Sequence, residues 1–243
     1  AGLGAVLVGA LSLLAVGEGR ALTLPPAAVG AVFLVTGLVL ADTDLDPAVV
    51  LVALLVLLVL LGSVFPWWAL SLTGRGVEQA YSLDDLTADP DEIDAAAVGA
   101  DARLAHEALL AIGATVGLLL VTVSPLAVGR GLSGTLLALV CAVVLMLRTR
   151  QYRTGTEVLV GLLSGVLGLV STAAAVLVLH PDWRPTTAVV LAATGGVLLA
   201  LTLVPAPPSV RRGRLGDVAE TVALLALLPL AVVACGLFAA IVG

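Results

Sequence analysis

Few residues in this chain could do chemistry within apolar surroundings. The sequence has only two histidines, His106 and His180, and two cysteines, Cys141 and Cys235. Both cysteines fall in apolar segments, where a free thiol behaves as a small hydrophobe, so we expect neither a disulfide nor a metal site. Lysine is absent, which excludes a P-loop nucleotide site of the GxxxxGK[ST] type. We therefore expect no cofactor, and any ATP would be hydrolysed by a partner.

The segment Gly131-Leu132-Ser133-Gly134 is the one that comes closest to a catalytic motif. It matches the GxSG element of rhomboid-type intramembrane serine proteases, which need a histidine base within hydrogen-bonding reach of the serine. His180 and His106 fall at the ends of other predicted helices, so neither is well placed to serve as that base. Small-residue helix packing explains the two glycines without catalysis. We expect no catalytic residue and no enzymatic activity.

The elements that must position these residues are long apolar helices. Hydrophobic residues make up 60% of the chain and charged residues 12%, whereas soluble domains carry about 25% charged residues. Apolar runs of about 17 to 25 residues recur, without the alternation of a barrel, so helices are the expected spanning structure. The sequence predicts an all-α polytopic membrane helix bundle with about eight transmembrane helices. The expected spans are 1–16, 25–41, 47–66, 104–123, 131–147, 158–179, 186–204 and 218–242.

One long polar segment divides the chain. We expect three transmembrane helices in residues 1–72, an acidic loop with a short helix in 73–103, and five transmembrane helices in 104–243. Within the loop, Asp89 is a predicted N-cap, Pro90 suits the first helical position, and Glu92 completes a capping box. The chain opens without methionine and already in apolar sequence, so we expect it to lack an upstream part.

Arginine placement predicts the orientation, because short basic loops stay in the cytoplasm. One side collects most of the arginines and the other collects only Arg130 and Arg184, so the acidic loop is expected in the cytoplasm and the C-terminus outside. The arginines of the first side are Arg20, Arg75, Arg103, Arg148, Arg150, Arg153, Arg211, Arg212 and Arg214.

The cytoplasmic charges are candidates for docking partner proteins, because an acidic loop is repelled by anionic headgroups and should project from the membrane. A merely solvated connector is the alternative reading of this loop. The docking candidates are Asp84, Asp85, Asp89, Asp91, Glu92, Asp94, Arg103, Arg148, Arg150, Arg153, Arg211, Arg212 and Arg214.

Two other groups of residues have expected structural roles. Trp67, Trp68 and Trp183 are predicted interfacial anchors. The GxxxG pairs, Gly113 with Gly117 and Gly161 with Gly165, are predicted helix-packing sites, either within one chain or between copies.

Ionisable side chains avoid the predicted helix midpoints, unlike those of most transporters and pumps. Glu107, Glu157 and Glu220 all fall within a turn or two of a cytoplasmic helix end. The spacing predicts that Glu157 pairs with Arg153, and Glu107 with Arg103, at i,i+4. These acids are therefore expected at the interface rather than on a transport path.

Three stretches together resemble the EccD membrane component of type VII (ESX) secretion systems of actinobacteria. The first is Asp101–Leu110, which enters a helix from the acidic loop. The second is the basic hairpin Leu147–Arg153 with the helix after it. The third is Leu215–Phe238, with Glu220 before Leu228-Pro229-Leu230-Ala231 and Cys235-Gly236-Leu237-Phe238. Their order and spacing carry the resemblance, which spans essentially the whole sequence.

The resemblance implies a non-enzymatic scaffold that corresponds to the C-terminal part of the family, about eight helices. It implies a homodimer that frames a lipid-facing cavity in the inner membrane, together with a secretion ATPase and other membrane subunits. The expected partners are a second copy, those subunits and lipids, with no nucleic acid. The alternative is a small-solute permease or transporter subunit, in which hydroxyls such as those of Ser171 and Thr172 would coordinate solute. A permease should show a polar cavity at mid-depth and broken helices.

Overall fold

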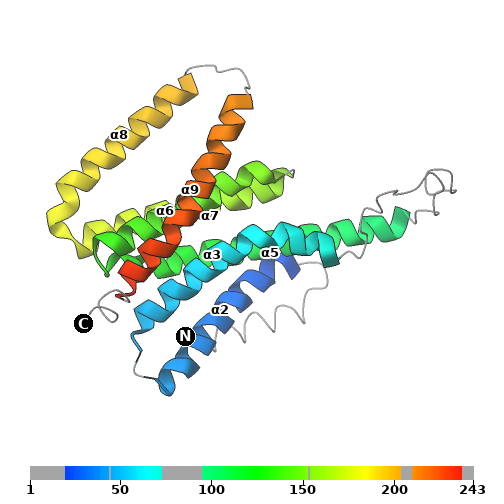
Figure 1. Cartoon of the computed structure of the whole chain (residues 1–243), viewed down its shortest axis with the longest axis horizontal. Coiled ribbons are helices and arrows are strands. Elements are labelled where there is room, and N and C mark those ends of the chain that lie inside the picture. Colours follow the sequence, from blue (N-terminus) through cyan, green and yellow to red (C-terminus); the bar gives the residue numbers. More distant parts are fainter. Residues whose placement is uncertain (1–19, 44, 73–94, 153, 204–209, 237–243) are drawn as a thin grey trace.

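The computed structural model describes residues 20–43, 45–72, 95–152, 154–203 and 210–236, and this part of the chain is helical throughout, with short connections (Figure 1). Five segments of it are long and apolar enough to cross a membrane, and a shorter apolar helix covers Pro47–Ser63. The all-α prediction is confirmed for the described residues, whereas the expected number of about eight transmembrane helices is not confirmed, and the expected span at 1–16 lies outside the described residues. The elements are α2 (Arg20–Ala41), α3 (Pro47–Leu72), α5 (Ala95–Val128), α6 (Leu132–Arg148), η1 (Thr149–Gln151), α7 (Gly155–Leu179), η2 (Pro181–Trp183), α8 (Arg184–Leu203) and α9 (Val210–Ala234).

The core lies where α5 and α6 meet their neighbours. Helix α7 packs against both α5 and α6, α9 packs against α6, and α2 and α3 pack against α5. Leu55 of α3, Leu120 of α5, Leu137 and Cys141 of α6, and Leu227 of α9 are all buried in one apolar cluster. Leucine, valine and alanine fill this cluster, as expected when packing rather than polar bonding joins helices in lipid.

Two helices differ most from the predicted spans. Helix α5 has 34 residues, about 51 Å at 1.5 Å per residue, so it exceeds the roughly 30 Å of hydrocarbon. Its segment before the span is continuous with it, and the predicted cap at Asp89 lies outside the described residues. Helix α9 begins at Val210 rather than at residue 218 and ends at Ala234 rather than at residue 242. It ends there because Gly236 adopts a positive φ of 72°, as glycines after helix ends commonly do.

Helix α8 stands apart from the bundle (Figure 1). Its contacts are with α7 and with the short η2 turn that precedes it. Almost every described side chain of α8 is exposed, including Val189, Val190 and Leu191. Lipid tails are as apolar as these side chains, so no hydrophobic force draws α8 onto its neighbours.

Several glycines of α5 and α7 lie at close contacts between helices. A Cβ atom added at Gly117 would overlap the Ser164 side chain of α7, and one added at Gly165 would overlap Met146 of α6. One at Gly161 would lie 2.6 Å from Thr149 Cγ2, whereas one at Gly113 would lie 3.7 Å from Val160 Cγ1, an ordinary contact. These close approaches occur within one chain.

Candidate functional site at the arginine-rich end

Polar contacts between helices gather at the two ends of the bundle. We call the end of α3 and α6, together with the beginning of α7 and α9 and the adjoining part of α5, the arginine-rich end. The other end holds the α2–α3 and α5–α6 connections and the ends of α7 and α9. Successive helices run in opposite directions, so the connections between them alternate between the two ends of the bundle. Charged residues from distant parts of the sequence therefore lie at the same end.

Arg148 is buried at the arginine-rich end rather than presented to a partner. Its side chain is 4% exposed, and one terminal nitrogen donates to the Val59 carbonyl and to Ser63 Oγ, each at 2.8 Å. The guanidinium occupies the space beside Gly62, where any Cβ would overlap it. The guanidinium therefore joins α6 to α3 inside the chain, and the docking role predicted for Arg148 stays a prediction.

The η1 turn connects α6 with α9. Gln151 Nε2 donates to both carboxylate oxygens of Glu220, each at 3.0 Å, and Glu220 is 8% exposed. Arg150 donates to the Gly213 carbonyl at 2.7 Å and lies 3.5 Å from the Asp217 carboxylate. The basic hairpin thus holds the beginning of α9 against the bundle, and Arg150 remains partly exposed.

His106 and Glu157 join α5 to α7. His106 Nδ1 lies 2.7 Å from Glu157 Oε1, and His106 Nε2 lies 3.3 Å from Thr156 Oγ1. Glu157 is buried in the first turn of α7, whose N-cap Thr154 accepts a hydrogen bond from the Glu157 amide at 3.4 Å. The sequence spacing predicts a pair between Glu157 and Arg153, but Arg153 lies outside the described residues.

Tyr152 sits among these charges. Burial raises the pKa of its phenol, the Arg148 guanidinium opposes this effect, and the carboxylates of Glu157 and Glu220 reinforce it. The phenol therefore stays protonated near neutral pH and adds no further negative charge to the cluster.

The opposite end carries a second set of ties. Arg130 Nη1 lies 2.6 Å from the Asp46 carboxylate, and Arg130 Nε donates to the Ala234 carbonyl at 3.0 Å. These contacts join the α2–α3 and α5–α6 connections to the end of α9. His180 Nε2 lies 3.0 Å from the Val128 carbonyl, and the His180 ring stacks on Trp183 with centroids 4.4 Å apart.

Ser133 is not paired with a histidine in the part of the chain that the structure describes. It lies in the first turn of α6, and no hydrogen bond in the described part of the chain joins it to His106 or His180, whose ring nitrogens contact other groups. Gly134 instead packs close to the Ala127 carbonyl. The small-residue interpretation of this motif accounts for its contacts.

The middle of the bundle carries no Asp, Glu, Arg or His side chain among the described residues of the candidate spans. Several of its hydroxyls donate to backbone carbonyls, whereas the buried Thr36 Oγ1 of α2 has no hydrogen-bond partner among the described residues. Ser171 Oγ donates to the Val121 carbonyl of α5, and Thr172 Oγ1 donates to the Gly168 carbonyl, each at 2.8 Å. These two hydroxyls therefore already have partners and do not project freely into a solute site.

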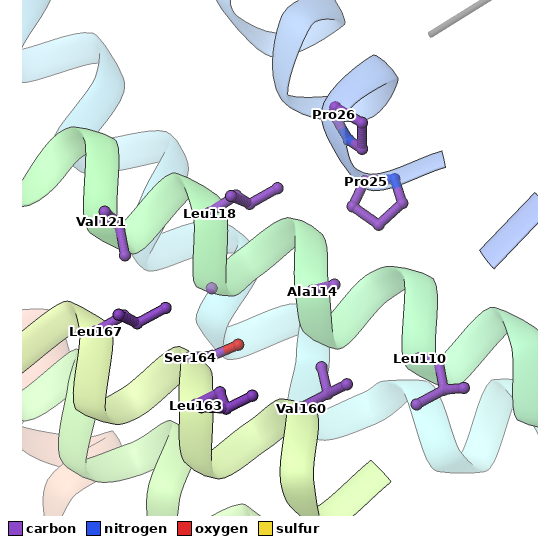
Figure 2. Close-up of a pocket in the computed structure, with 11 residues that line it drawn as sticks. Pro25, Pro26, Leu110, Ala114, Leu118, Val121, Val160, Leu163, Ser164 and Leu167 are labelled. Atoms are coloured by element: carbon purple, nitrogen blue, oxygen red, sulfur yellow. The ribbon is translucent and has the colours of Figure 1, made fainter. Parts of the chain in front are cut away.

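A groove of about 380 Å³ runs between α2, α5 and α7 (Figure 2). Its floor consists of the small residues Ala114, Gly117 and Ser164, and larger apolar side chains form its walls. The Ser164 hydroxyl is the one polar side-chain group among the lining residues. The wall residues are Pro25, Pro26, Leu110, Leu118, Val121, Val160, Leu163 and Leu167.

The other predicted site residues have varied locations. Arg103 and Arg214 are exposed, and Arg103 Nε donates to the Gly99 carbonyl rather than to Glu107. Arg211 and Arg212 lie in the first turn of α9, Trp67 and Trp68 lie near the end of α3, and Trp183 ends η2. The residues Asp84, Asp85, Asp89, Asp91, Glu92, Asp94 and Arg153 lie outside the described part of the chain.

Sequence spacing missed the contacts that cross between helices. The partners in His106–Glu157, Gln151–Glu220 and Arg148–Val59 are separated by 51, 69 and 89 residues. Membrane depth is the sequence signal that could have pointed to these contacts, because all of these residues fall near predicted cytoplasmic helix ends. Depth alone does not say which helices are neighbours.

Comparisons with known proteins agree with this architecture. The family of EccD-like transmembrane domains matches residues 1–243. A solved chain described as "Structure of protomer 1 of the ESX-3 core complex" has a similar fold, with a TM-score of 0.69 and 18% sequence identity. The similarity covers 98% of this chain and 57% of that chain. A comparison with curated protein sequences finds no match. The chain belongs to the family of EccD-like transmembrane domains.

Proposed function

We propose that this chain is a non-enzymatic membrane scaffold subunit of a type VII protein secretion complex. Family membership and the shared fold with an ESX-3 core complex protomer support the setting. The observation that carries the scaffold role is the distribution of charge. The buried charged side chains of the described spans, those of Arg148, Glu157 and Glu220, lie at the arginine-rich end, where they tie helices together, and the middle of these spans carries no Asp, Glu, Arg or His.

In this proposal two copies frame a membrane cavity in the inner membrane, and the arginine-rich end faces the cytoplasm. A secretion ATPase and other membrane subunits dock on charges at that end, and lipids surround the helices. Arg148 is removed from the docking surface because it is buried. The proposed surface comprises Asp84, Asp85, Asp89, Asp91, Glu92, Asp94, Arg103, Arg150, Arg153, Arg211, Arg212 and Arg214.

The permease alternative expects a polar, mid-depth cavity bounded by broken helices. The groove between α2, α5 and α7 is apolar apart from one hydroxyl, and the described spans are continuous helices. Substrate sites for small molecules need several convergent polar groups. These features favour the scaffold over the permease.

The docking role is tested by reversing charge in the acidic loop of the full-length protein. The triple variant Asp91→Lys, Glu92→Lys and Asp94→Lys is expressed in cells that make the complete secretion complex. Because each lost charged contact is worth about 1.5–3 kcal/mol, we expect the amount of co-purifying ATPase to fall about 10-fold or more. Purification in mild detergent and mass spectrometry of co-eluting subunits provide the measurement.

Asp182→Lys is the matched control, because Asp182 is an exposed acid at the opposite end of the bundle. It should leave the co-purifying subunits unchanged. If the triple variant retains its partners at the same level as Asp182→Lys, the acidic loop is a solvated connector and its docking role is refuted.

A further inference from the structure

The apolar lining of the groove between α2, α5 and α7 suits a chain-like apolar ligand (Figure 2). Along α5 it extends from Leu110 to Val121, about 16 Å at 1.5 Å per residue. The hydrocarbon core of a bilayer is about 30 Å thick, so the groove is about as long as one leaflet is deep. Its volume of about 380 Å³ lies within the range of small-molecule pockets.

The ends of the groove differ in polarity. Leu110 and Val160 line it, and the residues four positions earlier on the same helix faces are His106 and Thr156. These two side chains meet at 3.3 Å. The groove therefore starts one helical turn inside a polar pair at the arginine-rich end and runs from there into apolar surroundings.

Small residues leave the groove open. Helices α5 and α7 approach closely where Gly117 faces Ser164, and neither these residues nor Ala114 has a side chain large enough to fill the space between the walls. The walls include Leu163 and Leu167, which are 50% and 52% exposed, so the space is accessible from the side. A ligand can enter from the bilayer without passing through water.

We infer that this groove binds one acyl chain of a membrane phospholipid from the leaflet next to the arginine-rich end. A polar solute would have only the Ser164 hydroxyl as a side-chain partner in the groove, whereas an acyl chain needs none. The polar pair His106–Thr156 stands where the headgroup of that lipid begins. The site lies within a single chain, so it is distinct from a cavity between two copies and does not depend on the proposed secretion role.

The inference is tested with the full-length protein in phosphatidylglycerol nanodiscs that contain a phosphatidylglycerol with a diazirine in the middle of one acyl chain. After irradiation, mass spectrometry locates the labelled peptides. We expect peptides 110–121 and 160–167 to be labelled more strongly than α8, whose described side chains are almost all exposed and so report labelling by bulk lipid. Equal labelling of the groove and α8 would overturn the inference.

Variant Ala114→Phe fills the groove and should reduce labelling of both groove peptides to the level of α8. Ala174→Phe is its control, because Ala174 is an exposed α7 residue outside the groove and should leave labelling unchanged. Should Ala114→Phe fail to fold, Leu163→Trp fills the groove from its exposed wall. Undiminished labelling in a folded groove-filling variant would refute the site. A Leu163→Cys variant that crosslinks to another protein in native membranes would identify a helix as the occupant instead.

Discussion

Buried charged side chains at the arginine-rich end hold helices together. Each one bonds across to another helix or to the η1 turn: Arg148 to α3, Glu220 to Gln151, and Glu157 to His106. Hydrogen bonds that involve a charged group contribute about 1.5–3 kcal/mol, and removal of one partner leaves the other desolvated. These residues therefore specify which helix ends are neighbours, a task that uniform apolar surfaces cannot perform.

The His106–Glu157 contact should be energetically coupled. We expect a double-mutant cycle of His106→Ala and Glu157→Ala to give a coupling free energy of about 1 kcal/mol, because Glu157 is buried and its carboxylate contacts the imidazole directly. Reversible unfolding in mixed detergent micelles measures the free energies. The cycle of His106→Ala with Asp217→Ala, two residues without a mutual contact, should be additive. Additivity in both cycles would show that the 2.7 Å contact contributes nothing.

Sequence spacing did not predict the side-chain contacts of the described residues, even between residues on the same helix. The i,i+4 rule proposed Glu107–Arg103, but Arg103 Nε instead donates to the backbone carbonyl of Gly99. Hydropathy predicted the depth of Arg148 but not its burial beside α3, because it does not show that Gly62 leaves space there for the guanidinium. Contacts between residues more than fifty positions apart depend on the order of helices around the bundle, which no local pattern encodes.

Helical elements, by contrast, follow from hydropathy. The predicted span at 131–147 coincides within one residue of α6, and the prediction for 158–179 matches the end of α7 at Leu179. Lipid imposes this regularity, because backbone groups must bond within each span. Errors occur where helices leave the apolar layer, as in α5 and in the arginine-bearing start of α9, because water there permits a helix to continue or stop.

The two glycines of the α5 GxxxG pair should respond differently to substitution by alanine. Gly117→Ala forces the Ser164 side chain and α7 to shift, and such overpacking costs about 1–3 kcal/mol. Gly113→Ala meets Val160 Cγ1 at an ordinary 3.7 Å and gains helix propensity, so it should be neutral or stabilising. Thermal unfolding in detergent compares the two variants. Equal effects would indicate that α5 and α7 do not pack as described.

At the scale of the whole molecule, the charged contacts and the apolar packing occupy different parts of the bundle. The two ends carry polar ties, the middle is apolar, and α8 stands outside the packed helices (Figure 1). The charged side chains that join the helices lie at the ends of the bundle, where water can solvate them before the helices pack together. The exposed apolar faces of α7, α8 and α9 leave much of the surface to lipid or to other membrane helices. This organisation suits a subunit that supports an assembly.

The placement of charge also predicts the direction of insertion. Because arginine-rich loops remain in the cytoplasm, Arg214 should face the cytoplasm and Asp182 the outside, and both positions are exposed. Single cysteines at Arg214→Cys and Asp182→Cys are introduced into a chain that lacks Cys141 and Cys235. In intact cells, a membrane-impermeant maleimide should label the cysteine at position 182 only. Both should react after the membrane is permeabilised, which confirms that each site is accessible. Labelling at 214 in intact cells would place the arginine-rich end outside, and the proposed docking of a cytoplasmic ATPase there would then be impossible.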